Sequence, residues 1–197
     1  MFTGIIEALG VVTEVVTKGS NRTFRVESPL SHAFKIDQSV SHNGVCLTVE
    51  QVTENAHQVT AIDETLQKTS LGSWSAGTLV NLEQCLPMNG RLDGHFVQGH
   101  VDSTGICTNL LEKDGSWEYT IQFQEDFAAL MIEKGSISLN GISLTAFNVT
   151  NNSFTVAIIP YTYEHTNIKQ LKLGDTVNLE FDLIGKYITR KLALSAG

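Results

Sequence analysis

The sequence predicts an all-β protein made of two similar small β-barrels in tandem. Three observations carry this prediction: the chain repeats itself, its segments are short and rich in Val, Ile, Thr and Phe, and Gly, Asn and Asp separate them. Short strands with turn residues at such intervals are typical of β-sandwiches and barrels. The 197 residues leave about 100 for each half, an ordinary size for a domain.

The repeat is clearest in one short motif. Ser41–Val49 reads SHNGVCLTV, and Ser138–Ala146 reads SLNGISLTA. The offset is 97 positions, which is the difference between Gly141 and Gly44. Self-similarity at a fixed offset indicates that one ancestral domain of half the chain's length was duplicated.

The repeat extends beyond this motif to both ends of each half. The same offset aligns VNLE at Val80–Glu83 with VNLE at Val177–Glu180. Near the start of each half, Gly4 aligns with Gly99, an offset of 95, so a short insertion or deletion separates the two regions. The duplication therefore covers most of the chain.

Each half contains five segments that we interpret as strands. In the first half they are GVVTEVV, RTFRVES, GVCLTVEQVT, HQVTAID and TLVNLEQ. In the second half they are GICTNLL, WEYTIQF, GISLTAFNVT, FTVAIIP and TVNLEFD. Their partial alternation of apolar and polar residues predicts one face toward a core.

Short helices are expected between the second and third strands, at SPLSHAF and EDFAALMIEKG. Ser28 before Pro29 resembles an N-cap with proline at the first helical position. The turn-forming stretch PMNGRLDG, Pro87–Gly94, is the natural linker. We therefore place the two domains at residues 1–88 and 95–183.

The tail, residues 184–197, is predicted to be a C-terminal helix for oligomerisation. Ile184, Tyr187, Ile188 and Leu192 follow one another at helical intervals. A helix of about a dozen residues is marginal alone in water and needs a surface to pack on. That surface is either its own barrel or another subunit.

Composition excludes several classes of protein. Hydrophobic residues make up 42% and charged residues 17%, as in a folded chain. Thirteen Lys and Arg against 21 Asp and Glu give a net charge of −8, without a basic cluster for nucleic acid. We find neither a signal peptide nor an apolar run of about 18 residues, so we expect a cytoplasmic protein and no membrane partner.

Cysteine and histidine usage predicts no metal site. Cys46, Cys85 and Cys107 are odd in number and far apart, so we expect reduced thiols. His95 and His100 are an odd number of positions apart, so on a strand they would point to opposite faces. No other cluster of His, Asp or Glu suggests a metal hydrolase.

The two copies differ where chemistry matters. Cys46 aligns with Ser143, and His100 aligns with Ile5. The thiol therefore belongs to the first half and the imidazole to the second, and a Cys/His chemical pair must be assembled between barrels. The alternative is that Cys46, within the strand VCLTV, is a small core residue.

Glycines and threonines kept in both copies also have two interpretations. The glycines are turn or bulge residues, or they let a planar ligand lie close to the main chain. The threonines lie on strand surfaces or contact a ligand. These residues are Gly4, Gly44, Gly99, Gly141, Thr48, Thr65, Thr145 and Thr162.

Together MFTGIIE, the two NG-x-[CS]-LT motifs and GHFVQGHVD resemble the riboflavin synthase family, over nearly the whole chain. The resemblance implies two six-stranded Greek-key barrels and a homotrimer to which a C-terminal helix contributes. It implies an active site between the N-terminal barrel of one subunit and the C-terminal barrel of its neighbour. Association with lumazine synthase is a further partner to test.

The reaction implied by the resemblance is a dismutation without a cofactor. One 6,7-dimethyl-8-ribityllumazine donates a four-carbon unit to another, giving riboflavin and 5-amino-6-ribitylamino-uracil. One ring must lose a proton from its C7 methyl group, and the other must be attacked at C7. His100 is the candidate proton carrier, and Cys46 or Ser39, directly or through a water, assists addition.

The resemblance also implies the substrate contacts, one lumazine for each barrel. In the first barrel they are Gly4, Ile5, Ile6, Cys46, Leu47, Thr48, Thr60, Ala61, Ile62, Asp63, Glu64 and Thr65. In the second they are Gly99, His100, Val101, Lys134, Ser143, Leu144, Thr145, Ala157, Ile158, Ile159, Pro160, Tyr161 and Thr162. Main-chain amides suit the uracil-like edge, and hydroxyls with Glu64 suit the ribityl chain.

Two other classes of function compete with the enzyme. A lumazine or flavin antenna protein keeps the barrels and binds without catalysis, but such proteins lose parts of the reactive set that is retained here. An unrelated β-barrel binding module would leave the difference between Cys46 and Ser143 unexplained, and it predicts no yellow or fluorescent ligand on purification.

Overall fold

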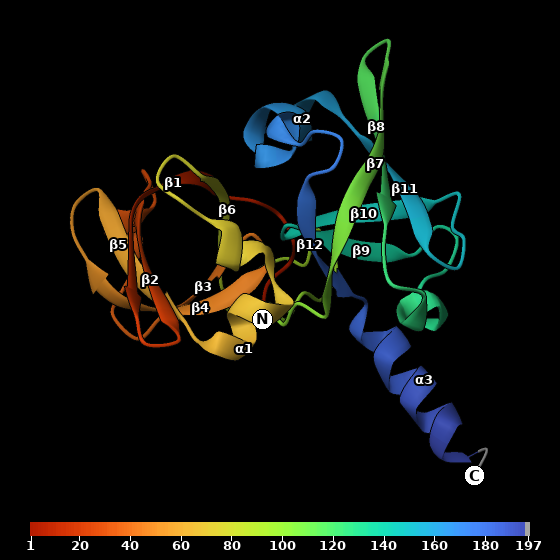
Figure 1. Ribbon diagram of the computed structural model, residues 1–197, viewed down its shortest axis with the longest axis horizontal. Coiled ribbons are helices and arrows are strands. Elements are labelled where there is room, and N and C mark those ends of the chain that lie inside the picture. The colour runs from red at the N-terminus through yellow and green to blue at the C-terminus, as the bar shows by residue number, and fades with distance from the viewer. Residues whose placement is uncertain (196–197) are drawn as a thin grey trace.

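The computed structural model, which describes residues 1–195, contains two closed antiparallel β-barrels side by side (Figure 1). The strand order is β1-β2-β5-β4-β3-β6 in the first barrel and β7-β8-β11-β10-β9-β12 in the second. The first has β1 (Ala8–Lys18), β2 (Asn21–Glu27), β3 (Ser39–His42), β4 (Val45–Val52), β5 (Ala56–Ala61) and β6 (Leu79–Gln84). The second has β7 (Ser103–Lys113), β8 (Ser116–Gln122), β9 (Ser136–Leu139), β10 (Ile142–Phe147), β11 (Ser153–Ile158) and β12 (Thr176–Phe181). The predicted fold class is confirmed.

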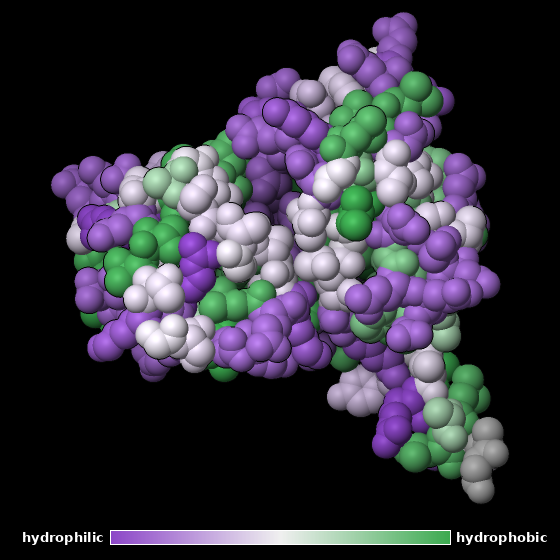
Figure 2. Space-filling view, viewed as in Figure 1, coloured by the Kyte–Doolittle hydropathy of each residue, from purple (hydrophilic) through white to green (hydrophobic). Residues whose placement is uncertain are grey.

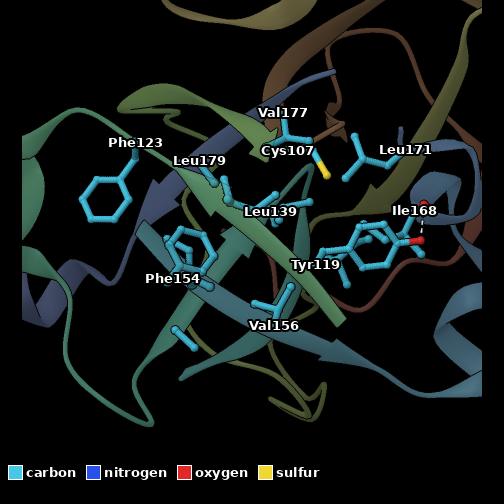
Figure 3. Close-up of a cluster of buried hydrophobic side chains, with 14 of the residues drawn as sticks. Cys107, Tyr119, Phe123, Leu139, Phe154, Val156, Ile168, Leu171, Val177 and Leu179 are labelled. Atoms are coloured by element: carbon cyan, nitrogen blue, oxygen red, sulfur yellow. Dashed lines mark hydrogen bonds between the residues drawn. The ribbon is translucent and has the colours of Figure 1, made fainter. Parts of the chain in front are cut away.

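Each barrel has its own core, because alternate residues of every strand point inward. In the second barrel Tyr119 lies among apolar side chains such as Leu139 and Val156 (Figure 3). Its hydroxyl donates to the carbonyl of Ile168 at 3.2 Å, which satisfies the one polar atom of the ring. Burial raises the pKa of Tyr119 to about 12. Each half can therefore fold around its own apolar centre.

The structure adds elements that the sequence patterns missed. Strands β3 and β9 end at the NG turns and were not among the predicted segments. The helix expected at SPLSHAF is a 3₁₀ turn, η1 (Ser31–Ala33), and the one at EDFAALMIEKG is η3 (Glu125–Leu130). Ser28 is not the N-cap of η1; it precedes the N-cap Leu30 and accepts that residue's N–H at 3.2 Å.

Two short α-helices replace the predicted strand ends after β5 and β11. They are α1 (Asp63–Lys68) and α2 (Pro160–His165). Asp63 and Glu64 lie in the first turn of α1, where acidic side chains interact favourably with the helix dipole. Pro160 is the first residue of α2. Two 3₁₀ turns follow them, η2 (Ser70–Ser73) and η4 (Asn167–Gln170).

The predicted C-terminal helix is present as α3 (Leu183–Ser195), and it projects away from the second barrel (Figure 1). The ion pair from Lys186 to Asp102, at 2.6 Å, ties its first turn to that barrel. Apolar surface runs along it (Figure 2), and its exposed apolar residues are Ile184, Tyr187, Ile188, Leu192 and Leu194. Ala196 and Gly197 of the predicted tail lie outside the described residues.

Within residues 1–195, no helix combines the length and apolar character needed to cross a membrane.

The two NG turns meet back to back where the barrels touch. Asn43 and Asn140 adopt φ values of 48° and 47°, and the glycines after them adopt 79° and 81°. A Cβ on Gly44 would lie 2.8 Å from the nitrogen of Gly141, and the reverse approach is 2.7 Å. Only glycine permits this contact. The motif is doubled because each copy is the other's packing surface.

A pair of asparagines fastens the two barrels across this junction. The side chain of Asn81 donates to the carbonyl of Asn140 at 3.0 Å, and the side chain of Asn178 donates to the carbonyl of Asn43 at 2.9 Å. Both asparagine side chains are buried, and their oxygens accept main-chain N–H groups from the other barrel. The barrels are therefore joined by satisfied, pseudo-symmetric polar contacts.

Candidate active site

Three predicted catalytic or binding residues share the outer face of the first barrel. Cys46 and Thr48 point outward from β4, because the alternate residues Leu47 and Val49 are buried in the core. Ser39 lies directly opposite Thr48 on β3. The strand pairing thus places a thiol and two hydroxyls on one surface.

A hollow of about 320 Å³ borders this surface. Helix α1 forms one side of it, and a segment from the second half of the chain forms the other. The lining residues are Val45, Cys46, Glu64, Thr65, Lys68, Thr69, Gly99, His100 and Val101. We call it the first pocket. Cys46 and His100 therefore line the same hollow, although they come from different halves of the sequence.

The second barrel carries a hollow of about 560 Å³, which we call the second pocket, at a place that partly overlaps the counterpart of the first pocket. Its residues come from β10, β11, the start of α2 and the approach to β9. They are Lys134, Ser143, Leu144, Thr145, Phe147, Ala157, Ile159 and Thr162. The two pockets share aligned positions, because Ser143 and Thr162 are the counterparts of Cys46 and Thr65, and they differ in chemistry, because a serine replaces the cysteine.

The segment that precedes each barrel crosses over to the other barrel. The N–H of Cys46 donates to the carbonyl of Gly99, and the N–H of Ser143 donates to the carbonyl of Gly4, both at 2.8 Å. A Cβ on either glycine would lie 2.6 Å from the Cβ of the residue it faces. The main chain therefore approaches Cys46 and Ser143 too closely for any side chain but that of glycine.

This crossing corrects one part of the sequence interpretation. Gly4, Ile5 and Ile6 were grouped with the first barrel, but Gly4 contacts Ser143 and Ile6 packs on the core of the second barrel. Gly99, His100 and Val101 were grouped with the second barrel, but they line the first pocket. The grouping was wrong because it assumed that each segment serves the barrel that follows it.

The surroundings of Cys46 favour the protonated thiol. Burial raises the pKa of its thiol, and the nearby Cys85 and Glu180 add to this effect. A hydrogen bond with Ser39 and the positive N-terminus act in the opposite direction. The thiolate is the nucleophilic form of cysteine. Cys46 is therefore better suited to hydrogen bonding or to assisting a water than to direct attack.

His100 combines a fixed main chain with a free side chain. Its N–H donates to a carboxylate oxygen of Glu180 at 2.8 Å, whereas the imidazole is exposed at the rim of the first pocket. Main-chain anchoring limits where the ring can reach. The ring nitrogens stay accessible to a bound molecule, as proton transfer requires.

Some of the predicted contacts cannot use their side chains. Leu47, Ala61 and Ile158 are buried in the barrel cores. The hydroxyl of Thr60 is paired with that of Thr23 at 2.9 Å. These positions shape the strands beneath the pockets, whereas the exposed Ile62 and Ile159 offer apolar surface beside them.

His95 was not among the predicted site residues, yet it lies at the edge of the second pocket. Its Nδ1 is 2.6 Å from the hydroxyl of Ser143, and burial lowers its pKa. The sequence interpretation treated His95 and His100 as parts of one strand, whereas the segment is irregular and the two imidazoles lie at different pockets. Among residues 1–195, no three His, Cys, Asp or Glu side chains are grouped as a metal site.

Comparison with known proteins first identifies the class of each barrel. The sequence matches the family described as Lumazine binding domain twice, over residues 3–85 and 98–182. Each match covers one barrel. The chain is therefore a protein of two lumazine-binding domains.

Full-length relatives define the family more closely. The chain is 37% identical to the riboflavin synthase of Bacillus subtilis (strain 168) over 98% of this chain and 90% of that protein. It is 40% identical to the riboflavin synthase of Mycobacterium bovis over 100% of both chains. The chain belongs to the riboflavin synthase family, which confirms the family and the class of enzyme predicted from the motifs.

Solved structures share the fold. The crystal structure of LumP complexed with riboflavin has a TM-score of 0.86 at 21% identity, and it covers 92% of this chain and 99% of that one. The structure of LumP complexed with 6,7-dimethyl-8-(1'-D-ribityl) lumazine gives 0.84 at 19% identity, with the same coverage. At this identity the likeness concerns the fold alone.

Proposed function

We propose that the chain converts two molecules of 6,7-dimethyl-8-ribityllumazine into riboflavin and 5-amino-6-ribitylamino-uracil. The observation that carries the proposal is a pair of pockets, one on each barrel, that share aligned positions but differ in chemistry, within a chain of the riboflavin synthase family. Two identical substrate molecules that play unlike parts need such a pair. The atoms balance without an oxidant, a reductant or a cofactor.

Chemical roles follow from the surroundings of each side chain. His100 is the proton carrier, since its exposed imidazole stands at the rim of the first pocket. Cys46 and Ser39 assist addition at C7 of the acceptor ring, directly or through a water, because the raised pKa keeps the thiol protonated. Holding two rings face to face supplies much of the acceleration, about 7–11 kcal/mol in favourable cases.

The substrate has two parts that the pockets must bind, a flat ring and a ribityl chain. The exposed Ile62 and Ile159 offer apolar contact to the flat rings. Thr65 and Glu64 at the first pocket, with Thr162 and Lys134 at the second, offer hydroxyl and charged groups to the ribityl hydroxyls. The remaining sequence-predicted contacts around these pockets belong to the same proposal.

The reaction requires the two pockets to face each other, and we place the catalytic site between adjacent subunits of a homotrimer. The exposed apolar side of α3 supports this assembly, because an apolar helix needs a surface to cover it. The proposal includes the cytoplasm as compartment, consistent with three free cysteines. Association with lumazine synthase, which would bring substrate close, remains part of the proposal.

The direct test is to mix the purified chain with 6,7-dimethyl-8-ribityllumazine alone in buffer treated with a chelator. We expect one riboflavin for every two lumazines consumed, followed by absorbance and chromatography. Binding with fluorescence but without riboflavin would contradict the proposal and would indicate a carrier or antenna. An unchanged lumazine spectrum and no binding would exclude both functions.

A further inference from the structure

The duplicated VNLE motif contains two buried glutamates whose purpose the reaction alone does not explain. On β6 and β12 the apolar residues of the motif point into the barrel cores, so Asn and Glu point outward into the junction. The asparagines fasten the barrels together. Glu83 and Glu180 are 3% and 2% exposed, and a buried carboxylate requires hydrogen-bond donors.

Main-chain N–H groups supply most of those donors. Glu180 accepts from the N–H groups of Gln98, Gly99 and His100 at 2.6, 2.9 and 2.8 Å. Burial raises the pKa of Glu180, while these donors and Lys186 lower it. Both carboxylate oxygens act as acceptors, which suits the ionised form.

Glu83 repeats the arrangement in the first barrel. It accepts from the N–H of Thr3 at 2.6 Å, from the hydroxyl of Thr3 at 2.7 Å and from the N–H of Gly4 at 2.9 Å. Each glutamate thus holds the segment that precedes its own barrel. Both held segments are the ones that cross to the opposite barrel.

Two chains of hydrogen bonds therefore link the barrels, one running from the second barrel to the first and one from the first to the second. Glu180 of the second barrel holds Gly99, whose carbonyl accepts the N–H of Cys46 in the first barrel. Glu83 of the first barrel holds Gly4, whose carbonyl accepts the N–H of Ser143 in the second. A carboxylate of the second barrel therefore holds a segment that lines the first pocket, and a carboxylate of the first barrel holds the segment that contacts Ser143 of the second pocket.

We propose that Glu180 and Glu83 are positioning residues, each of which sets the geometry of the pocket on the opposite barrel. Glu180 fixes the main chain of His100 and its distance from Cys46, and Glu83 fixes the main chain of Gly4 against Ser143, which lines the second pocket. A glutamine is the informative substitution because it has nearly the same shape. Its amide offers one acceptor oxygen and presents N–H groups to N–H donors.

The test follows the two crossed amides by hydrogen exchange in the ¹⁵N-labelled full chain, comparing Glu180→Gln and Glu83→Gln with the parent. In Glu180→Gln we expect the Cys46 amide to exchange at least about tenfold faster, with the Ser143 amide unchanged. In Glu83→Gln we expect the reverse. The core amide of Tyr119 serves as a control for global unfolding.

The alternative is that the glutamates only stabilise the fold. A purely structural role would speed exchange of both crossed amides in both variants, together with the core control, and that result would overturn the proposal. So would unchanged exchange at both amides. Because no ligand is added, this measurement decides the inference whether or not the chain makes riboflavin.

The catalytic consequence rests on the proposed function. In Glu180→Gln we expect kcat to fall by about tenfold or more with a smaller change in KM, because His100 loses its anchor while most substrate contacts stay. A rise in KM without a fall in kcat would contradict its role in placing the proton carrier. A parent that forms no riboflavin would refute the proposed function, not the exchange result.

Discussion

A chain of hydrogen bonds inside the first barrel predicts that this half is the more sensitive to acid. The hydroxyl of Ser31 is 2.8 Å from Nδ1 of His57, whose Nε2 is 2.8 Å from Nε2 of His42. Nδ1 of His42 is 3.0 Å from the carbonyl of Val40. The carbonyl can only accept, so one direction of donors satisfies every atom, and both imidazoles are then neutral. A proton added to Nε2 of His42 would place two N–H groups opposite each other.

The size of the effect follows from the pKa values. Burial lowers the pKa of His42 to about 3 and that of His57 to about 4, from 6.5. The unfolded chain therefore binds protons below pH 6.5 that the folded chain refuses, so stability falls as the pH falls. Between pH 7 and about pH 5, each histidine costs about 2 kcal/mol, or about 4 kcal/mol together.

The second barrel supplies the matched control. Its residues at the aligned positions are Leu139 and Phe154, both fully buried. The double variant His42→Leu/His57→Phe copies this apolar pair into the first barrel. It removes both imidazoles together, so neither ring is left without the other. The buried hydroxyl of Ser31 loses its partner His57, but this cost is present at every pH and does not change the pH dependence.

Trp74, in the core of the first barrel, reports on this half when Trp117 is replaced by phenylalanine. We expect urea unfolding followed by its fluorescence to show a loss of about 2–4 kcal/mol in the parent from pH 7 to about pH 5, and much less in the double variant. The same pH dependence in both proteins would refute the reasoning.

Three further outcomes test the site and the junction. Cys46→Ser is expected to retain part of the riboflavin formation, and His100→Ala to lower turnover more than binding; equal loss of both would remove His100 from proton transfer. Gly44→Ala should cost about 1–3 kcal/mol more in urea unfolding than Gly19→Ala, where φ is also positive but nothing lies nearby; equal costs would contradict the back-to-back turns. Asn178→Ala should cost about 1–3 kcal/mol, and no change would show that this clamp is dispensable.

The sequence predicted the fold well because the repeat carries the architecture. Once Gly44 was aligned with Gly141, every strand pattern in one half supported the same pattern in the other. Strand β3 was missed because it is only four residues long, Ser39–His42, and ends directly at the NG turn. Helix α1 was missed because it follows β5 almost directly, so its start was interpreted as the end of that strand.

The sequence named Cys46 and His100, which the structure places at one pocket, but it did not give the correct grouping of the segments around them. Cys46 and His100 stood out because their aligned partners differ in chemistry, and this signal is local in the sequence. The crossing of the segments at Gly4 and Gly99 depends on contacts between halves, which a repeat offset cannot reveal. The repeat also contains VNLE, but the role of Glu180 depends on which main-chain N–H groups reach its carboxylate, and only the structure shows these.

The central claim is that two unlike pockets, contributed by different subunits, serve two substrate molecules. Thr65 and its counterpart Thr162 line the first and the second pocket and are only half-buried, so Thr65→Trp and Thr162→Trp would obstruct one pocket each without disturbing a core. Each variant alone is expected to form no riboflavin. After subunit exchange, a mixture is expected to regain activity, because an intact first pocket can then meet an intact second pocket. A mixture as inactive as its separate components would contradict the account.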